Sequence, residues 1–206
     1  MKIEVKNSVK PVDYAQSMKI LEQRVNDVYL GKKGELLWLL EHNTVFTAGT
    51  SSNKKDLLDK SIPIIKTNRG GKHTLHSPGQ KVVYFVLNLN KRKKDIRNLV
   101  SNIENCIIEI LKEYKIKSFA DKKNIGIWVN DKNKTEKIAA IGIRVKKWVA
   151  YHGFSLNVST DLSKYKEIVP CGIKDKGVTS LKKLGVDEYD NVNKIIIKKF
   201  LTFFHL

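Results

Sequence analysis

Two cysteines occur in this 206-residue sequence, and their surroundings suggest different roles. Cys171 stands between a proline and a glycine, which indicates a bend or strand end where a side chain can face a pocket. A thiol there is either a nucleophile whose thiolate a neighbouring group such as lysine stabilises, or a buried and inert thiol. Cys106 falls on the apolar stripe of a helical pattern, where a free cysteine behaves as a small hydrophobe. We expect Cys106 in the core and leave both roles open for Cys171.

Lys137 begins an apolar stretch, residues 137–145, with the composition of a β-strand. On a strand it shares one face with Ala139, Ile141 and Ile143. If these neighbours exclude water from the amine, they lower its pKa and suit it to proton transfer. The alternative is an ordinary lysine with its amine in water, and among 34 lysines composition does not single this one out.

Residues 69–80 form a glycine-rich segment between two predicted strands. Gly70, Gly71 and Gly79 permit positive φ and a close backbone approach to a ligand, while Pro78 stiffens the exit. Such a loop can present backbone N–H groups to an oxygen atom. Its spacing matches neither a P-loop nor a Rossmann motif, and an ordinary turn remains the alternative.

The residue types of a metal site are present, but their spacing does not indicate one. His73, His76, His152 and Cys171 could be combined, but their spacing is not a zinc signature and no carboxylate cluster or further cysteine supports it. We therefore expect neither a metal nor another cofactor.

Composition excludes several protein classes. Hydrophobic residues make up 41% of the chain, enough to bury a core, which argues against wholesale disorder. No run approaches the length of about 18 apolar residues that a membrane span needs, and the N-terminus has no secretory h-region. Two cysteines do not make a disulfide framework. We expect a soluble cytoplasmic protein with no membrane partner.

The net charge of +18 is the most unusual bulk property. A basic surface attracts nucleic acid, anionic membranes or acidic proteins. However, only five of the 39 basic residues are arginine, and the lysines are scattered apart from a block at residues 91–94. No nucleic-acid motif is present, so we expect no nucleic-acid partner. Attraction of an acidic protein and compositional drift both remain open.

Hydrophobic periodicity predicts three helices and a set of strands. Asp13 and Gln16 form a capping-box pattern before the first helix. Helices separated by runs of strands predict a single α+β domain, residues 1–206, with a mixed and largely antiparallel sheet flanked by helices. The predicted helices are 14–28, 99–114 and 195–204, with one helical turn at 56–59; the predicted strands are 36–40, 62–66, 82–89, 125–129, 138–145 and 148–158, the last two joined by a turn at Lys146-Lys147.

Short motifs in a fixed order run from about Glu41 to Leu184, and together they resemble the lipoyl(octanoyl) transferase family. Each motif alone is only moderately specific, but their order makes the resemblance specific. The motifs are Glu41-His42, residues 45–47, Arg69-Gly70-Gly71, Thr74, His76, residues 78–80, 126–129, 137–142, 152–154, 156–158, 168–173 and 178–181.

This resemblance implies the fold of the biotin and lipoate protein ligase catalytic domain. It also implies transfer of octanoyl from octanoyl-acyl carrier protein to a lysine of lipoyl domains, those of 2-oxoacid dehydrogenase complexes and the glycine cleavage H protein. Cys171 would hold the acyl group as a thioester, and Lys137 would lower the pKa of the thiol and relay protons. No cofactor is implied, and we expect a monomer.

The family's substrate-binding positions map onto three segments of this chain. Two positions depart from the family pattern: Leu75 stands where the family usually has tyrosine, and Ser77 where it has glycine. The mapped residues are Arg69, Gly70, Gly71, Lys72, His73, Thr74, Leu75, His76, Ala140, Ile141, Gly142, Gly153, Phe154 and Ser155.

Other activities remain alternatives. An ATP-dependent lipoate or biotin-type ligase would share the fold without a cysteine nucleophile, although residues 69–72 lack the Gly-Arg-Gly-Arg type loop of biotin ligases. A transferase that moves octanoyl between two lipoyl-type domains would use the same cysteine. A basic nucleic-acid-binding module is the alternative from a different class.

Overall fold

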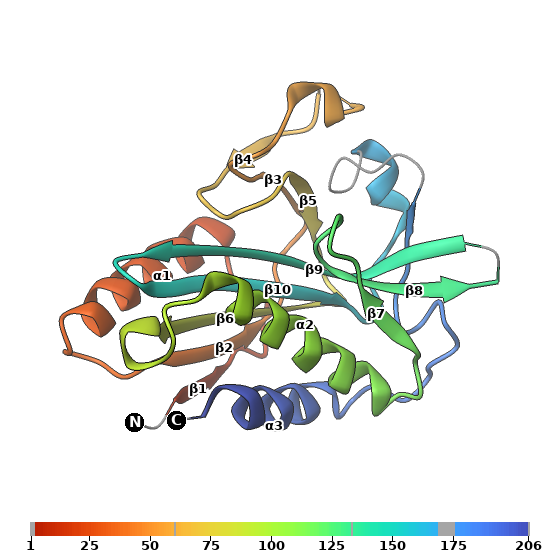
Figure 1. The fold of residues 1–206 in the computed structure, drawn as a ribbon. Helices are drawn as coiled ribbons and strands as arrows, with labels where there is room; N and C mark the ends of the chain where they lie inside the picture. The colour runs from red at the N-terminus through yellow and green to blue at the C-terminus, as the bar shows by residue number, and fades with distance from the viewer. Residues whose placement is uncertain (1–2, 60, 133, 169–175, 206) are drawn as a thin grey trace.

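The computed structural model describes residues 3–59, 61–132, 134–168 and 176–205 (Figure 1). Helices and strands alternate irregularly along the chain, without a repeating βαβ unit. The elements are β1 (Glu4–Asn7), α1 (Tyr14–Tyr29), β2 (Leu36–Leu40), β3 (Val45–Ala48), η1 (Lys54–Asp56), β4 (Ile64–Lys66), β5 (His73–His76), β6 (Gln80–Asn88), η2 (Leu89–Lys91), α2 (Ile96–Lys112), β7 (Ser118–Ala120), β8 (Ile127–Asp131), β9 (Lys134–Lys146), β10 (Val149–Asn157), η3 (Ser163–Glu167), β11 (Gly177–Val178) and α3 (Val192–Phe204).

A large sheet with strand order β1-β2-β6-β10-β9-β8-β7 forms the centre of the molecule, and β11 pairs with β9 beside this path. The neighbours are antiparallel except for β1 with β2 and β11 with β9, which are parallel. A separate three-stranded sheet has the order β4-β3-β5. The predicted α+β class with a mixed, largely antiparallel sheet is confirmed.

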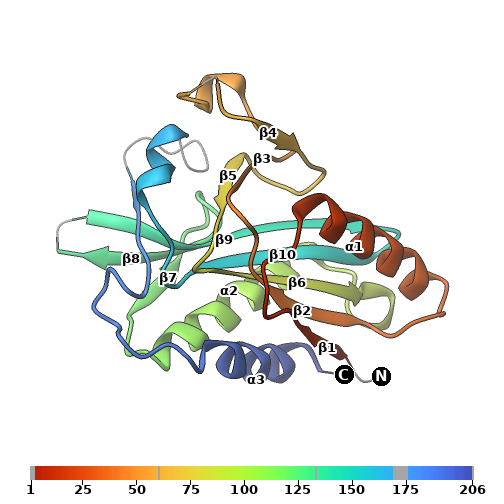
Figure 2. The ribbon, with the colours of Figure 1, turned by 180° about the vertical axis from the view of Figure 1, so that it is seen from behind.

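Helices cover both faces of the large sheet, with α1 on one face and α2 and α3 on the other (Figures 1 and 2). The sequence of strand β6 is a continuous apolar run because its alternate side chains are buried in two different cores. Val82 and Tyr84 pack in the core under α1, whereas Val83 and Phe85 pack in the core with α2 and α3.

The three predicted helices are confirmed, and their caps explain where they begin. Asp13 accepts a hydrogen bond from the Gln16 backbone N–H (2.8 Å) at the start of α1. Asp95 accepts one from Asn98 (3.0 Å), so α2 begins at Ile96 rather than at the first apolar-stripe residue. Cys106 is fully buried in the core as expected, and burial raises its thiol pKa to about 12.

The β9–β10 hairpin is confirmed, but its turn lies one residue later than predicted. Lys146 pairs with Val149, so the two turn residues are Lys147 and Trp148, with φ of 52° and 60°. A two-residue turn with positive φ at both positions is normally marked by Asn-Gly or Asp-Gly, and this sequence carries no such signal.

Two other local predictions are corrected. The segment 69–80, predicted as a loop, contains strand β5, which pairs with β3 in the small sheet. The helical turn predicted at 56–59 is a 3₁₀ turn that ends at Asp56. Strands β1, β3, β5, β7 and β11 were not predicted, because all are two to four residues long and too short for a periodic pattern. Among the helices in the described part of the chain, none is long and apolar enough to cross a membrane.

Candidate active site

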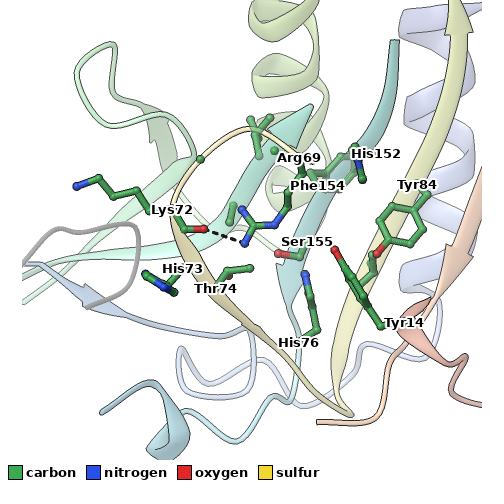
Figure 3. A pocket seen from close by; sticks show the side chains of 16 residues that line it. Tyr14, Arg69, Lys72, His73, Thr74, His76, Tyr84, His152, Phe154 and Ser155 are labelled. Atoms are coloured by element: carbon green, nitrogen blue, oxygen red, sulfur yellow. Dashed lines mark hydrogen bonds between the residues drawn. The ribbon is translucent and has the colours of Figure 1, made fainter. Parts of the chain in front are cut away.

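A pocket opens on the α1 side of the large sheet and crosses β9, β10 and β6 (Figure 3). The space between its lining residues, which is continuous with solvent at the mouth, is about 510 Å³. Small side chains on β9 and β10 leave this space free. Strand pairing aligns two rows across its floor, Ala140–Ser155–Val82 and Gly142–Gly153–Tyr84.

Two glycines allow close backbone contacts here. A Cβ atom on Gly153 would lie 1.9 Å from the Val83 carbonyl oxygen of β6, so no other residue fits without moving a strand. A Cβ on Gly142 would lie 3.1 Å from the carbonyl oxygen of Gly70 in the loop above. The sheet and the loop can therefore meet closely around the pocket.

The loop before β5 covers the pocket, and Arg69 holds it in place. Arg69 is 9% exposed, and its guanidinium donates to the carbonyl oxygens of Thr47 (3.1 Å), Gly70 (3.0 Å) and Lys72 (2.8 Å) (Figure 3). The Gly70 N–H in turn donates to the Ile143 carbonyl oxygen of β9 at 3.2 Å. These bonds attach the loop both to the small sheet and to the large one.

All of the predicted substrate-binding residues except Gly70 and Leu75 line this pocket. Gly70 instead lines an adjoining groove. Leu75 is fully buried in a small core with Phe46 and Tyr165, because successive side chains of β5 point to opposite sides. The departure from the family's tyrosine at Leu75 therefore lies outside the pocket wall.

Ser77, the other departure, introduces no backbone strain. The positive φ in this turn falls on Gly79, at +82°, and Ser77 is not among the described residues with positive φ. A Cβ on Gly79 would lie 2.8 Å from Ser159, so glycine is needed there and not at position 77.

Lys137 lies beside the pocket with its amine inside the protein. The residue is 5% exposed, and its Nζ donates to the Ile125 carbonyl oxygen (3.0 Å) and lies 4.6 Å from the Trp128 ring centroid. It lines a small cavity together with Thr74 and Ser155, which also line the main pocket. The strand predicted for Lys137 is confirmed, and its amine is not the solvated strand-end amine of the alternative interpretation.

Gly126 provides the space that the Lys137 side chain occupies. Its φ is +132°, and a Cβ there would lie 3.2 Å from Lys137 Nζ and 2.8 Å from the Ala139 carbonyl oxygen. Any larger residue at this position would disturb the amine.

A more open groove reaches Lys137 from another direction. It is lined by Lys72 and Lys123 as well as by Asn124, Ile125 and Ile143. Cavities on two sides therefore share Lys137 as a wall residue.

Cys171, the predicted nucleophile, lies outside the described residues. Before this gap, Ile168 is buried and forms a β-bridge with Leu57. After it, Lys176 Nζ lies 4.4 Å from the centroid of the Trp128 ring that Lys137 also contacts. Gly177 and Val178 then pair with Glu136 and Lys137 as β11.

The inner end of the pocket contains residues that the sequence did not identify as substrate-binding: Tyr14, Val82, Tyr84 and His152. The alternation of β6 was a usable signal, since it places Val82 and Tyr84 on one face. No sequence pattern placed Tyr14, the first residue of α1, against them. His152 was considered as a metal ligand and as part of the 152–154 family motif, but not as a substrate-binding residue.

The histidines at this inner end are buried and neutral. Burial, with a smaller contribution from nearby positive charge, lowers the pKa of His76 and of His152 to about 3. Burial also lowers the pKa of His42, which packs beside them. Among the residues that the structure describes, no three metal-ligating side chains come together.

The sequence and fold both match known proteins. The model of the lipoyl protein ligase A/B catalytic domain matches residues 13–201. The chain is 46% identical over 205 residues to an octanoyltransferase of Ehrlichia chaffeensis, covering 98% of this chain and 96% of that protein. It is 50% identical over 175 residues to an octanoyltransferase of Wolbachia pipientis subsp. Culex pipiens, covering 84% and 85%.

Among solved structures, lipoate-protein ligase A bound with ATP superposes with a TM-score of 0.77 at 16% identity, covering 100% of this chain and 86% of that one. A T. acidophilum protein with bound lipoic acid gives a TM-score of 0.78 at 17% identity, covering 100% and 87%. At these identities the structures support the fold, and the sequence relatives support the activity. The chain belongs to the lipoyl protein ligase A/B catalytic domain family and, within it, to the octanoyltransferases, which are acyltransferases.

Proposed function

We propose that this octanoyltransferase takes its acyl group from octanoyl-acyl carrier protein and passes it to the acceptor lysine of lipoyl domains. The acceptors are the lipoyl domains of 2-oxoacid dehydrogenase complexes and the glycine cleavage H protein. The acyl chain lies in the pocket across β9, β10 and β6, and its carbonyl carbon lies towards Lys137. No metal or other cofactor takes part.

In the first half-reaction, the Cys171 thiolate attacks the octanoyl thioester. The new carbon–sulfur bond forms as the bond to the carrier's phosphopantetheine sulfur breaks, and Lys137 supplies the proton to that departing sulfur. The product is an octanoyl thioester on Cys171. Exchange of one thioester for another changes little free energy, so the step needs no nucleotide.

In the second half-reaction, the amine of the acceptor lysine attacks the Cys171 thioester. The amide bond forms, the carbon–sulfur bond breaks, and Lys137 removes the proton that the amine loses. This restores the Cys171 thiolate and the protonated Lys137 for the next cycle. An amide is much more stable than a thioester, so the acyl group stays on the acceptor, and the two half-reactions give ping-pong kinetics.

The position of Lys137 is the observation that carries this proposal. Its buried amine borders the cavity that adjoins the acyl pocket and also borders the open groove. A donor and an acceptor could thus reach the same amine from the groove while the acyl chain stays in the pocket. The described chain resumes at Lys176, five positions after Cys171, against the same Trp128 ring.

An activity assay with alternative acyl sources tests the proposal. We expect transfer to a lipoyl domain from octanoyl-acyl carrier protein without ATP, and none from free octanoate with ATP. Lys137→Met should lower kcat by at least about a hundredfold, the usual range for a proton-transferring side chain. Lys134→Met removes an exposed lysine of the same strand and serves as the control. Transfer that requires ATP and free octanoate would instead indicate an adenylating ligase.

We further infer that residues 1–206 act as one catalytic domain, as a monomer, in the cytoplasm. Sedimentation of the purified chain tests the monomer. A stable dimer at assay concentrations would contradict it.

A further inference from the structure

The acyl pocket ends in a polar wall rather than an apolar one. From β9 it crosses two strand spacings to β6, about 10 Å, a length comparable with an extended octanoyl chain. At that end the polar lining side chains are Tyr14, His76, Tyr84 and His152, beside the apolar Val82. Figure 3 shows Tyr14, His76 and Ser155 turned towards the same space. The methyl end of an octanoyl chain would therefore meet hydroxyl and imidazole groups.

A series of hydrogen bonds fixes which nitrogen of His76 carries its proton. Asn157 Nδ2 donates to the Thr179 carbonyl oxygen (2.9 Å), which leaves Asn157 Oδ1 to accept from Gln80 Nε2 (2.9 Å). Gln80 Oε1 must then accept from His76 Nδ1, at 2.7 Å. Because His76 is neutral, its Nε2 carries a lone pair, and no described residue donates to it.

His152 is fixed in the opposite tautomer. Asn68 Nδ2 donates to Glu22 (2.9 Å), so Asn68 Oδ1 accepts from His152 Nε2 at 2.7 Å. Nδ1 of His152 therefore carries the lone pair. This residue is 2% exposed, and Nδ1 has no hydrogen-bond partner among the described residues. A buried acceptor without a partner is unfavourable and indicates a missing donor.

The two tyrosines of the wall have already used their hydrogens. His42 Nδ1 must donate to the Val12 carbonyl oxygen (2.7 Å), so its Nε2 accepts from the Tyr84 hydroxyl at 2.9 Å. The Tyr14 hydroxyl donates to Thr67 Oγ1 at 3.2 Å. All four side chains of the wall thus offer lone pairs, and none of them offers a free proton.

We propose that this inner end of the pocket is a subsite for a hydroxyl group, which donates its single hydrogen to Nε2 of His76. With an unsubstituted octanoyl chain the subsite holds a water molecule. With an acyl chain that ends in a hydroxyl group, such as 8-hydroxyoctanoyl, the terminal hydroxyl takes the place of that water. The assignment rests on the proposed function, since it assumes that the acyl chain occupies this pocket.

The subsite makes the pocket selective for the length of the acyl chain. A chain one methylene longer than octanoyl must displace the water and leave the His76 Nε2 acceptor unpaired, which disfavours binding. An 8-hydroxyoctanoyl chain has nearly the same size as nonanoyl but keeps a hydrogen bond to His76 Nε2. An apolar wall would give the reverse preference, since it would leave the hydroxyl unpaired.

The test compares kcat/KM for octanoyl, nonanoyl and 8-hydroxyoctanoyl groups on the same carrier protein. The variants are His76→Leu, which removes the acceptor, and His76→Gln, which can restore one through its side-chain oxygen. Ratios between acyl groups are used within each variant, so they do not depend on the folded fraction of that variant.

For the parent protein we expect 8-hydroxyoctanoyl to exceed nonanoyl by about tenfold or more, the loss expected for an unpaired buried acceptor. His76→Leu should abolish this preference, and His76→Gln should retain most of it. Loss of the preference in His76→Leu and its retention in His76→Gln are the results expected if a terminal hydroxyl occupies the subsite. If instead His76→Leu only raises kcat/KM for nonanoyl relative to octanoyl, the occupant is water alone and the hydroxyl subsite is overturned.

Equal ratios in the parent and His76→Leu would overturn the subsite while leaving octanoyl transfer intact. If the parent transfers none of the three acyl groups, the proposed function itself fails, so the two failures are distinguishable.

Discussion

At the scale of single residues, the site depends on neighbouring residues that leave space for the functional side chains and accept their hydrogen bonds. Lys137 keeps its amine buried because Gly126 leaves room for it and Ile125 accepts its hydrogen bond. Trp128 contributes the ring on which both Lys137 and Lys176 lie. Cations are attracted to the face of a tryptophan ring, so Trp128 gathers two amines near one point.

Gly126→Ala should therefore impair catalysis as well as stability. The new methyl group would press on Lys137 Nζ and on the Ala139 carbonyl oxygen, at a φ of +132° that alanine avoids. We expect a loss of about 1–3 kcal/mol in unfolding free energy and at least a tenfold fall in kcat per folded molecule. The control is Gly185→Ala, where φ is +81° but nothing lies within 4 Å. A kcat equal to that of the control would contradict the role assigned to Gly126.

The buried histidines should make stability depend on pH. His76 has a pKa of about 3 when folded, against an ordinary value of 6.5 when unfolded. Between those values the unfolded chain binds a proton that the folded chain does not, so stability falls as pH falls from about 6.5 towards 3. The slope is at most about 1.4 kcal/mol per pH unit for each such histidine.

We expect urea unfolding of His76→Gln to show a shallower fall over this window than the parent, because one titrating group is removed. His152 has the same direction of shift and should supply much of the remaining slope. Identical slopes for the parent and His76→Gln would show that His76 is not buried as a neutral group.

At the scale of elements, the pocket exists because β6, β10 and β9 lie side by side with small residues in the middle strand. Gly153 allows the β10 and β6 backbones to approach without a side chain between them. The Arg69 hydrogen bonds then bring the loop before β5 over this floor. The binding segments, which are far apart in sequence, are joined by strand pairing.

Gly153→Ala should be among the most damaging single-methyl changes in this chain. Its Cβ would lie 1.9 Å from the Val83 carbonyl oxygen, so β6 and β10 must separate locally. We expect a loss above about 3 kcal/mol, measured by chemical unfolding, or failure to obtain folded protein. Gly31→Ala, at a φ of +72° with nothing within 4 Å, should cost only about 1 kcal/mol. Similar losses at the two positions would refute the close-contact explanation.

Long periodic segments were predictable from the sequence, and short ones were not. The helices α1, α2 and α3 and strands β2, β6, β9 and β10 carry patterns of five or more residues that local propensity supports. Strands β3 and β5 exist because tertiary pairing and the core around Leu75 stabilise them. The turn at Lys147 and Trp148 lacks the residues that usually mark its type.

The site was predictable in part. The family resemblance identified most of the pocket floor and loop, and the structure places those residues together. It did not identify Tyr14, Tyr84 or His152 as pocket residues, because their grouping depends on how α1 packs on the sheet. Spacing alone could not relate Cys171 to Lys137, which are 34 positions apart.

At the scale of the whole molecule, the net charge of +18 could assist an acidic donor. Lys72 and Lys123 line the groove that leads to Lys137. Exposed charges act over about 10 Å at moderate ionic strength, so they affect the rate of encounter more than the bound complex.

We expect kcat/KM for octanoyl-acyl carrier protein to fall several-fold as salt rises from about 0.05 to 0.5 M. The control substrate is octanoyl-pantetheine, which is neutral and should show little change. Lys72→Glu combined with Lys123→Glu should reduce the salt dependence of the carrier-protein reaction. A kcat/KM that does not depend on salt would leave compositional drift as the explanation of the charge.

The central claim, a covalent octanoyl thioester on Cys171, is tested most directly by intact-protein mass spectrometry. The protein is mixed with octanoyl-acyl carrier protein, without acceptor and without ATP, alongside Cys171→Ala and Cys106→Ala. We predict one octanoyl adduct on the parent and on Cys106→Ala, released by hydroxylamine, and none on Cys171→Ala. The absence of an adduct from the parent, or an adduct that persists in Cys171→Ala, would contradict the mechanism.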